Sequence, residues 1–175
     1  MIEVRVQSLG IDQGSKSPVV ILQETDGDRV LPIWIGPGEA SAIAMELAGM
    51  KFSRPLTHDL AASLIRGMGG VLTRVLITRV EENTYFAELV IQRGSEVFSV
   101  DARPSDSIAI ALRAQARVFA SEELLGDTPP GTGADPLLEP QDEELGPGEE
   151  GTQSAEQLQD YLRKLNPEDL GRFNP

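Results

Sequence analysis

The chain has 175 residues, no cysteine and a formal net charge of −13, which exclude disulfide bonds, thiolate metal sites and a broad basic surface for polyanions. The acidity is uneven. Residues 1–125 carry 16 acidic and 12 basic side chains, a net charge of −4, whereas residues 126–175 carry 12 acidic and 3 basic, a net charge of −9. A polyanion site in the first part must therefore be a local arginine cluster or must recruit a cation.

The N-terminal segment lacks the basic stretch and apolar run of a signal peptide, and no stretch of about 18 apolar residues predicts a membrane span. A chain without cysteine also suits a reducing compartment. These features favour a cytoplasmic protein that makes no contact with a membrane.

The first expected element is a β-strand close to the N-terminus. Residues 2–10 alternate apolar and polar side chains, which is typical of a half-buried strand. Two more strands are expected at 18–23 and 29–35, joined by Asp-Gly turn residues at 25–28. Pro32 cannot donate a backbone hydrogen bond, so we expect the third strand at an edge of the sheet or at a bulge.

Three helices are expected, after the breaks at residues 36–38, 54–55 and 103–104. The first should end at Gly49, because glycine favours the backbone conformation that terminates a helix. The residues suited to cap the second and third helices are Thr57, and Ser105 or Asp106.

A meander of strands is expected between the second and third helices, at 71–80, 84–92 and 96–101. Residues 118–120 add a short strand and 121–125 a turn. This order of elements predicts an α+β fold, with a mixed or mostly antiparallel sheet and about three helices packed on it.

After residue 125 the composition changes to proline, glycine and acidic residues, which cannot support a core. We therefore predict one domain over 1–125, a disordered acidic linker over 126–153, and a short amphipathic helix with a C-terminal tail over 154–175. The helix is marginal alone, so it either folds only against another surface or docks on this domain or a partner protein. Its apolar face consists of Leu158, Tyr161, Leu162 and Leu165.

Two Arg-Pro turns resemble each other, because Arg54 precedes His58 and Asp59, and Arg103 precedes Asp106. A purely structural interpretation is sufficient for each turn. Proline fixes the entry to the helix, and the acid in the first turn interacts with the positive end of the helix dipole.

A functional interpretation of the same turns is also open. His58 is the only histidine, and imidazole suits proton transfer near neutral pH. Asp101 and Arg103 should project to one face at a strand end, where Asp101 with Asp106 could bind Mg²⁺ or Mn²⁺. Arg54 and Arg103 could hold phosphate oxygens. The alternatives are an ordinary helix-start histidine and an Asp–Arg ion pair.

Several familiar sites are excluded by their missing signatures. The chain has no Walker-type phosphate loop, no Cys/His zinc spacing and no G-x-S-x-G elbow. Aromatic residues do not alternate with basic ones, so no stacking platform for single strands is predicted. Trp34 lies in an apolar run and is expected in the core or at an interface rather than against a base.

Three motifs occur in order: LPIWIGPGEASAIA at 31–44, RPLTHDL at 54–60 and VDARPSDSIAIALR at 100–113. Their combination resembles the bifunctional nuclease domain family over about residues 1–125. The resemblance implies a compact α+β domain that often self-associates and that in some members cleaves both DNA and RNA. The site residues that it implies, each within a matching motif, are Glu39, Arg54, His58, Asp59, Asp101, Arg103 and Asp106.

Two functions follow as alternatives. The first is a metal-assisted nuclease for DNA or RNA, with a possible Mg²⁺ or Mn²⁺ ion and no organic cofactor. Its catalytic residues would be His58, Asp59, Asp101 and Asp106, its substrate-binding residues Arg54 and Arg103, and its candidate metal ligands Asp101, Asp106 and Glu39. The second is a non-catalytic regulatory or scaffold module that binds an anionic ligand or a partner protein. In either case, an exposed strand edge around Trp34 suggests a two-fold homodimer.

Overall fold

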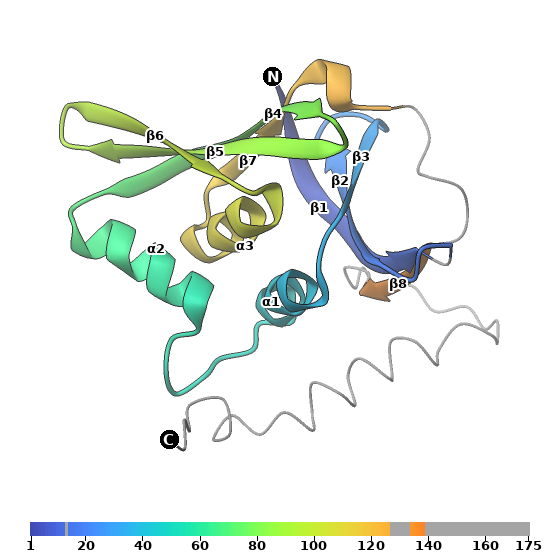
Figure 1. Cartoon of the computed structure of the whole chain (residues 1–175). Helices are drawn as coiled ribbons and strands as arrows, with labels where there is room; N and C mark the ends of the chain where they lie inside the picture. The colour runs from blue at the N-terminus through green and yellow to red at the C-terminus, as the bar shows by residue number, and fades with distance from the viewer. Residues whose placement is uncertain (13, 127–133, 139–175) are drawn as a thin grey trace.

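The computed structural model describes residues 1–12, 14–126 and 134–138. These residues form an α+β fold, as predicted, in which a curved mixed sheet lies over three helices (Figure 1). The strands are β1 (Ile2–Asp12), β2 (Pro18–Glu24), β3 (Val30–Trp34), β4 (Val71–Glu81), β5 (Thr84–Arg93), β6 (Glu96–Ala102), β7 (Arg117–Ala120) and β8 (Ala134–Leu138).

The strand order is β3-β2-β1-β7-β4-β5-β6, with β8 paired to β1 outside this path. Neighbouring strands are antiparallel except β4 and β7, which are parallel. β3 lies at one edge, so Pro32 costs the sheet no central hydrogen bond and the expectation for this strand is confirmed. β6 forms the other edge.

The helices are α1 (Pro37–Leu47), α2 (Thr57–Gly67) and α3 (Pro104–Ala114), followed by a 3₁₀ turn at Glu122–Leu124. α3 packs against both other helices and against β4, β5 and β7. It is buried on most sides, and its small residues Ser105, Ser107, Ala109 and Ala111 let the neighbouring elements approach closely. Ile108 on α3 and Ile43 on α1 are fully buried in the core between the layers.

In α2 and α3, the two helices that follow an Arg-Pro turn, the N-cap lies one or more residues before the residue predicted to cap the helix. The N-cap positions are Leu56 and Arg103, and neither makes a side-chain cap bond. At α3, Pro104 is the first helical residue, because its fixed φ already matches a helix and its missing N–H is not needed there. At α2, the backbone N–H of Leu56 donates to the Asp59 carboxylate at 2.8 Å, so a residue inside the helix supplies the cap.

β8 lies within the segment 126–153 that composition predicted as a disordered linker. β8 pairs antiparallel with β1, with Leu138 opposite Leu9. The rest of that linker and the amphipathic helix predicted within 154–175 lie outside the described residues. Among the helices that the structure describes, none has the length and apolarity needed to cross a membrane.

Candidate functional site

The first turns of the three helices meet at one polar cluster, which consists of Glu39, His58, Arg103 and Asp106. His58 Nε2 lies 3.0 Å from Asp106 Oδ1, and Arg103 Nε donates to Asp106 Oδ2 at 2.8 Å. Arg103 Nη1 lies 2.9 Å from Glu39 Oε1. We call these four residues the helix-start cluster. It brings together parts of all three sequence motifs.

Local sequence places each member of the cluster. Asp106 lies three residues after Arg103, the spacing at which the two side chains meet across the first turn of a helix. A carboxylate there is also favoured by the helix dipole, and the same holds for Glu39 in the first turn of α1. Glu39 folds back over Gly36, where any side chain would collide with its carboxylate, so Gly36 allows this position.

The pKa of Asp106 reflects competing effects. Burial of the carboxyl raises the pKa, but hydrogen bonds and charge from Arg103 and His58 together outweigh burial and hold the pKa below its usual range. The pKa of Arg103 is raised, chiefly by its hydrogen bond to Asp106. The cluster therefore holds an ionised Asp106 between two nitrogen donors at neutral pH.

Two members of the cluster can face a ligand. The Arg103 side chain is 67% exposed, and its N–H groups beyond the two that bind Asp106 and Glu39 remain available to a phosphate. The His58 side chain is 15% exposed. An ionised carboxylate can only accept a hydrogen bond, so Asp106 favours the His58 tautomer whose Nε2 carries the proton. The lone pair of that tautomer is on Nδ1. That tautomer can accept a proton.

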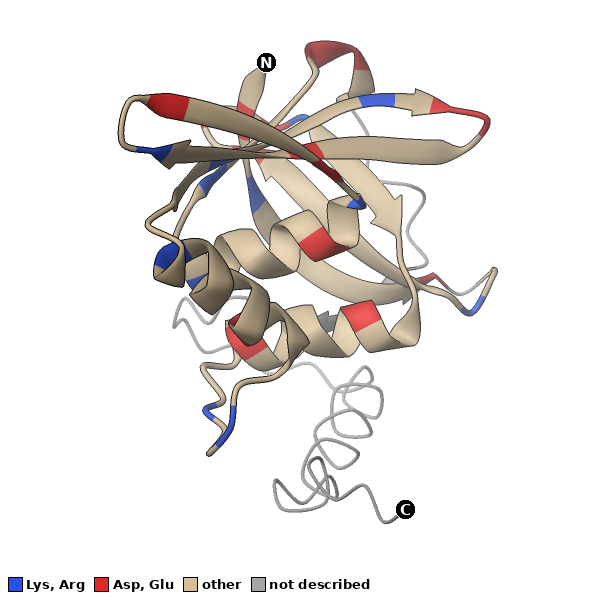
Figure 2. Ribbon diagram, turned by 60° about the vertical axis from the view of Figure 1, so that its left-hand side comes forward, with Lys and Arg blue, Asp and Glu red and all other residues tan. Residues whose placement is uncertain are grey.

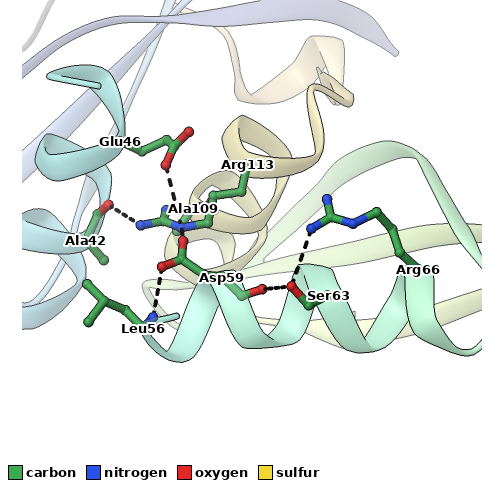
Figure 3. A network of polar contacts seen from close by, with 8 residues as sticks. All are labelled: Ala42, Glu46, Leu56, Asp59, Ser63, Arg66, Ala109 and Arg113. Carbon is green, nitrogen blue, oxygen red and sulfur yellow. Dashed lines mark hydrogen bonds and ion pairs between the residues drawn. The ribbon is translucent and has the colours of Figure 1, made fainter. Parts of the chain in front are cut away.

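Asp59 belongs to a different network, although it is next to His58 in the sequence. Its carboxylate accepts a hydrogen bond from Arg113 Nε and another from the backbone of Leu56 (Figure 3). The Arg113 side chain is only 6% exposed and also donates to the carbonyl oxygens of Ala42 and Ala109. Asp59 therefore neutralises a buried arginine and joins α2 to α3, which is a structural role.

Asp101 does not join the cluster. Asp101 is on β6, opposite Glu88 of β5. It lies between Val100 and Ala102, whose side chains face the helices. Because side chains alternate along a strand, Asp101 projects from the outer face, where it is exposed. The expectation that Asp101 and Arg103 share a face is wrong, because the chain leaves the strand at Ala102 and Arg103 turns toward the helices.

The predicted metal ligands therefore do not form a set. Asp101 is on the outer face. Asp106 is paired with Arg103 and His58, and Glu39 is paired with Arg103. No group of three or more acidic, histidine or cysteine side chains with metal-binding geometry occurs in the described part of the chain. These residues as arranged do not fit a Mg²⁺ or Mn²⁺ ion, whose ligands must converge. Arg54 is exposed, and no hydrogen bond or ion pair to it is found among the described residues.

Sequence reasoning missed two features. The first is Arg113, whose signal was an arginine within the apolar run of α3, since a buried arginine needs acidic partners. The second is a hollow of about 350 Å³ beside the cluster, lined by Glu39 and Arg103 together with Trp34 and Tyr85. Trp34 was expected in the core or at an interface, and with 44% of it exposed it does not lie in the core.

The charge distribution agrees with the composition. In Figure 2, both basic and acidic residues occur on the sheet and on the helices. Long-range attraction of a polyanion is therefore weak, and a ligand must be held by local contacts at the cluster.

The comparison with known proteins fits this geometry. A family model described as the bifunctional nuclease domain matches residues 20–129. The chain belongs to this family. The match covers all three sequence motifs and the whole helix-start cluster, so the family resemblance noted in the sequence is confirmed.

Relatives in the family differ in how much of this chain they share. An uncharacterized protein of Mycobacterium tuberculosis is 38% identical over 168 residues, which cover 96% of this chain and 97% of that protein. Bifunctional nuclease 1 of Arabidopsis thaliana is 27% identical over 111 residues, 61% of this chain and 34% of that protein. Bifunctional nuclease 2 of Oryza sativa subsp. japonica is 26% identical over 122 residues, 67% of this chain and 38% of that protein. The chain thus spans little more than a third of these plant relatives.

The structural role of Asp59 can be tested by stability measurements. Asp59→Asn leaves buried Arg113 without its closest anion, and should lower the free energy of unfolding by about 3 kcal/mol in urea titrations. Glu46→Gln is the matched control, because Glu46 lies 3.8 Å from the same arginine and is more exposed, so its loss should cost less than about 1 kcal/mol. Equal effects of the two substitutions would contradict this assignment.

The contribution of Asp106 to stability should depend on pH. Its pKa is lower in the folded than in the unfolded chain, so its stabilisation is present above the unfolded pKa of about 3.9 and is lost as the pH falls through the folded pKa. The difference in unfolding free energy between wild type and Asp106→Asn should therefore shrink from about pH 5 to about pH 3. Asp101→Asn, at an exposed site, should unfold like the wild type. A difference that grows toward low pH would refute this account.

Proposed function

We propose that this protein hydrolyses phosphodiester bonds in DNA or RNA at the helix-start cluster. The observation that carries the proposal is the pairing of the only histidine with Asp106 at 3.0 Å, directly beside an arginine that is two-thirds exposed. Family membership supports the choice of substrate, because the plant relatives carry the name bifunctional nuclease.

Each member of the cluster would have a distinct part in the reaction. Asp106 orients His58 and stabilises the imidazolium that forms when Nδ1 takes a proton from the attacking water. The oxygen of that water forms the new bond to phosphorus, the bond to the leaving oxygen breaks, and the leaving oxygen receives a proton from imidazolium. Arg103 binds a phosphate oxygen and opposes the charge that develops on it, while Glu39 holds the guanidinium in place.

The dependence on Mg²⁺ or Mn²⁺ remains a prediction from the sequence. The proposed steps use only side chains of the cluster, since Asp101, Asp106 and Glu39 do not converge. A cleavage assay with and without chelator tests this directly. Activity that persists after chelation supports the steps above, whereas loss on chelation with recovery on adding Mg²⁺ or Mn²⁺ supports the sequence prediction.

A second candidate function is a regulatory or scaffold module that binds an anion without turnover. It is favoured by the ion pairs that already occupy Asp59 and Asp106, and by a net charge of −4 over residues 1–125, which weakens nonspecific binding of nucleic acid. This function predicts no hydrolysis under any metal condition, together with a higher melting temperature in phosphate that Arg103→Ala abolishes.

The hydrolytic proposal predicts which substitutions remove activity. His58→Ala and Asp106→Asn should each lower the initial rate of cleavage of a labelled single-stranded oligonucleotide about 10²- to 10⁴-fold, because each removes proton transfer by a positioned imidazole. Asp101→Asn is the control and should cleave at the wild-type rate, because its side chain lies on the outer face. Wild-type cleavage by folded Asp106→Asn would refute the proposal.

We also propose that the protein forms a two-fold dimer, though through β6 rather than through the strand edge around Trp34. Every residue of β6 from Glu96 to Asp101 is exposed, and its unpaired backbone groups form a sheet edge. Its helix-facing side chains Phe98 and Val100 line an apolar groove of about 310 Å³ with Leu64 and Met68 of α2.

Antiparallel pairing of two β6 strands about Ser99 would place Phe98 of each copy opposite Val100 of the other, and Asp101 opposite Val97. Apolar side chains then meet on the helix side, and no two carboxylates oppose each other across the interface. A second copy therefore pairs with this edge in a register that joins apolar side chains and keeps carboxylates apart.

Light scattering after size exclusion measures this directly. The wild-type chain should elute as a dimer, and Val100→Lys should be monomeric, because an inward-pointing charge blocks pairing of an edge strand. Val80→Lys, at an exposed valine of β4 away from this edge, should stay dimeric. A monomeric wild type at high micromolar concentration, or a dimeric Val100→Lys, would rule out this interface.

A further inference from the structure

The hollow beside the helix-start cluster has the shape and chemistry of a binding site. It has a volume of about 350 Å³ and lies between the end of β3, the turn from β4 to β5, and the starts of α1 and α3. Glu39 and Arg103 form part of both the hollow and the cluster. A group in the hollow would therefore lie next to a phosphate bound by Arg103.

The hollow contains an aromatic surface that the fold itself does not use. Trp34 is the last residue of β3 and is 44% exposed, whereas its neighbour Ile33 is buried in the core. The half-exposed indole lines the hollow, and every nucleobase can stack on an accessible aromatic ring. The chain has no other tryptophan.

A phenol lines the same hollow as this indole. Burial raises the pKa of Tyr85, so its phenol remains protonated and can donate a hydrogen bond to a ligand in the hollow.

The charge of the domain favours a base contact as the source of affinity. Duplex DNA is bound mainly through many phosphate contacts, which require a basic face. Residues 1–125 instead carry a net charge of −4, with 16 acidic and 12 basic side chains. Stacking of a base is independent of charge, so a domain of this kind can bind nucleic acid through one ring and one or two phosphates.

We propose that the hollow takes one unpaired nucleobase, stacked on Trp34, with the adjoining phosphate on Arg103. The substrate is then a single-stranded or locally unpaired nucleic acid, because a base inside a duplex is stacked on both faces by its neighbours. The choice of a nucleic acid as ligand rests on the proposed nuclease function, but the base contact can be measured without any cleavage.

Fluorescence of the only tryptophan reports on this contact directly. The full chain carrying His58→Ala, which should not consume its ligand, is titrated with a short oligothymidylate and with an oligomer of equal length that has no bases. Only the oligomer with bases should quench Trp34, and it should bind roughly 5- to 150-fold more tightly, the range expected from stacking one base. Equal quenching by both oligomers would overturn the proposal.

Anisotropy of a labelled oligothymidylate extends the test to Trp34 variants. Trp34→Ala should weaken binding roughly 5- to 150-fold, whereas Trp34→Phe should retain most of the affinity because it keeps an aromatic face. Phe119→Ala, which removes a partly exposed aromatic ring from β7 outside the hollow and away from the β6 edge, is the matched control and should bind like its parent. Unchanged binding by folded Trp34→Ala, or equally tight binding of a fully paired duplex, would refute the base site.

The two proposals fail separately in these experiments. Quenching by the oligomer with bases, without cleavage by the wild-type chain, supports the base site and refutes hydrolysis. Cleavage by the wild-type chain that is equally fast for single-stranded and paired substrates, and unaffected by Trp34→Ala, refutes the base site alone.

Discussion

The two oxygens of Asp106 accept hydrogen bonds from two helix starts at once, and the rest of the site depends on this arrangement. One oxygen binds His58 at the start of α2, and the other binds Arg103 at the start of α3, which in turn reaches Glu39 on α1. A half-buried carboxylate in this position must stay ionised and paired, because leaving either donor or the acid without a partner is costly. The same constraint that joins the helices therefore also orients the imidazole and the guanidinium.

The cluster separates structural from chemical roles among neighbouring residues. His58 and Asp59 are adjacent in the first turn of α2, but their side chains point to different partners. Asp59 neutralises an arginine that is almost entirely buried, whereas His58 lies beside an exposed one. A buried ion pair fixes the position of α2 against α3, and this rigid support is what a precisely oriented histidine requires.

The surface of the domain limits the ligands that suit it. With a net charge of −4 over residues 1–125, and with β6 and Trp34 as exposed apolar features, the domain is poorly suited to bind an intact duplex. The edge at β6 suits a second copy of the chain, and the hollow at Trp34 suits a single ring next to a phosphate. No residue lines both the groove at β6 and the hollow at Trp34, so the two features are separate sites.

The sequence alone determined the α+β class, almost every strand and helix, and the edge position of the strand with Pro32. It also determined the family. These features follow from periodicity, turn residues and short motifs, which are local signals. Only the tertiary structure decided which acids meet. Asp101 and Asp106 are close in the chain, yet strand alternation sends one outward and a helix turn sends the other inward. Arg113 binds Asp59 across 54 residues of sequence, and Trp34 borders a hollow made from four separate segments. Such contacts depend on how helices and strands pack, which no local pattern encodes.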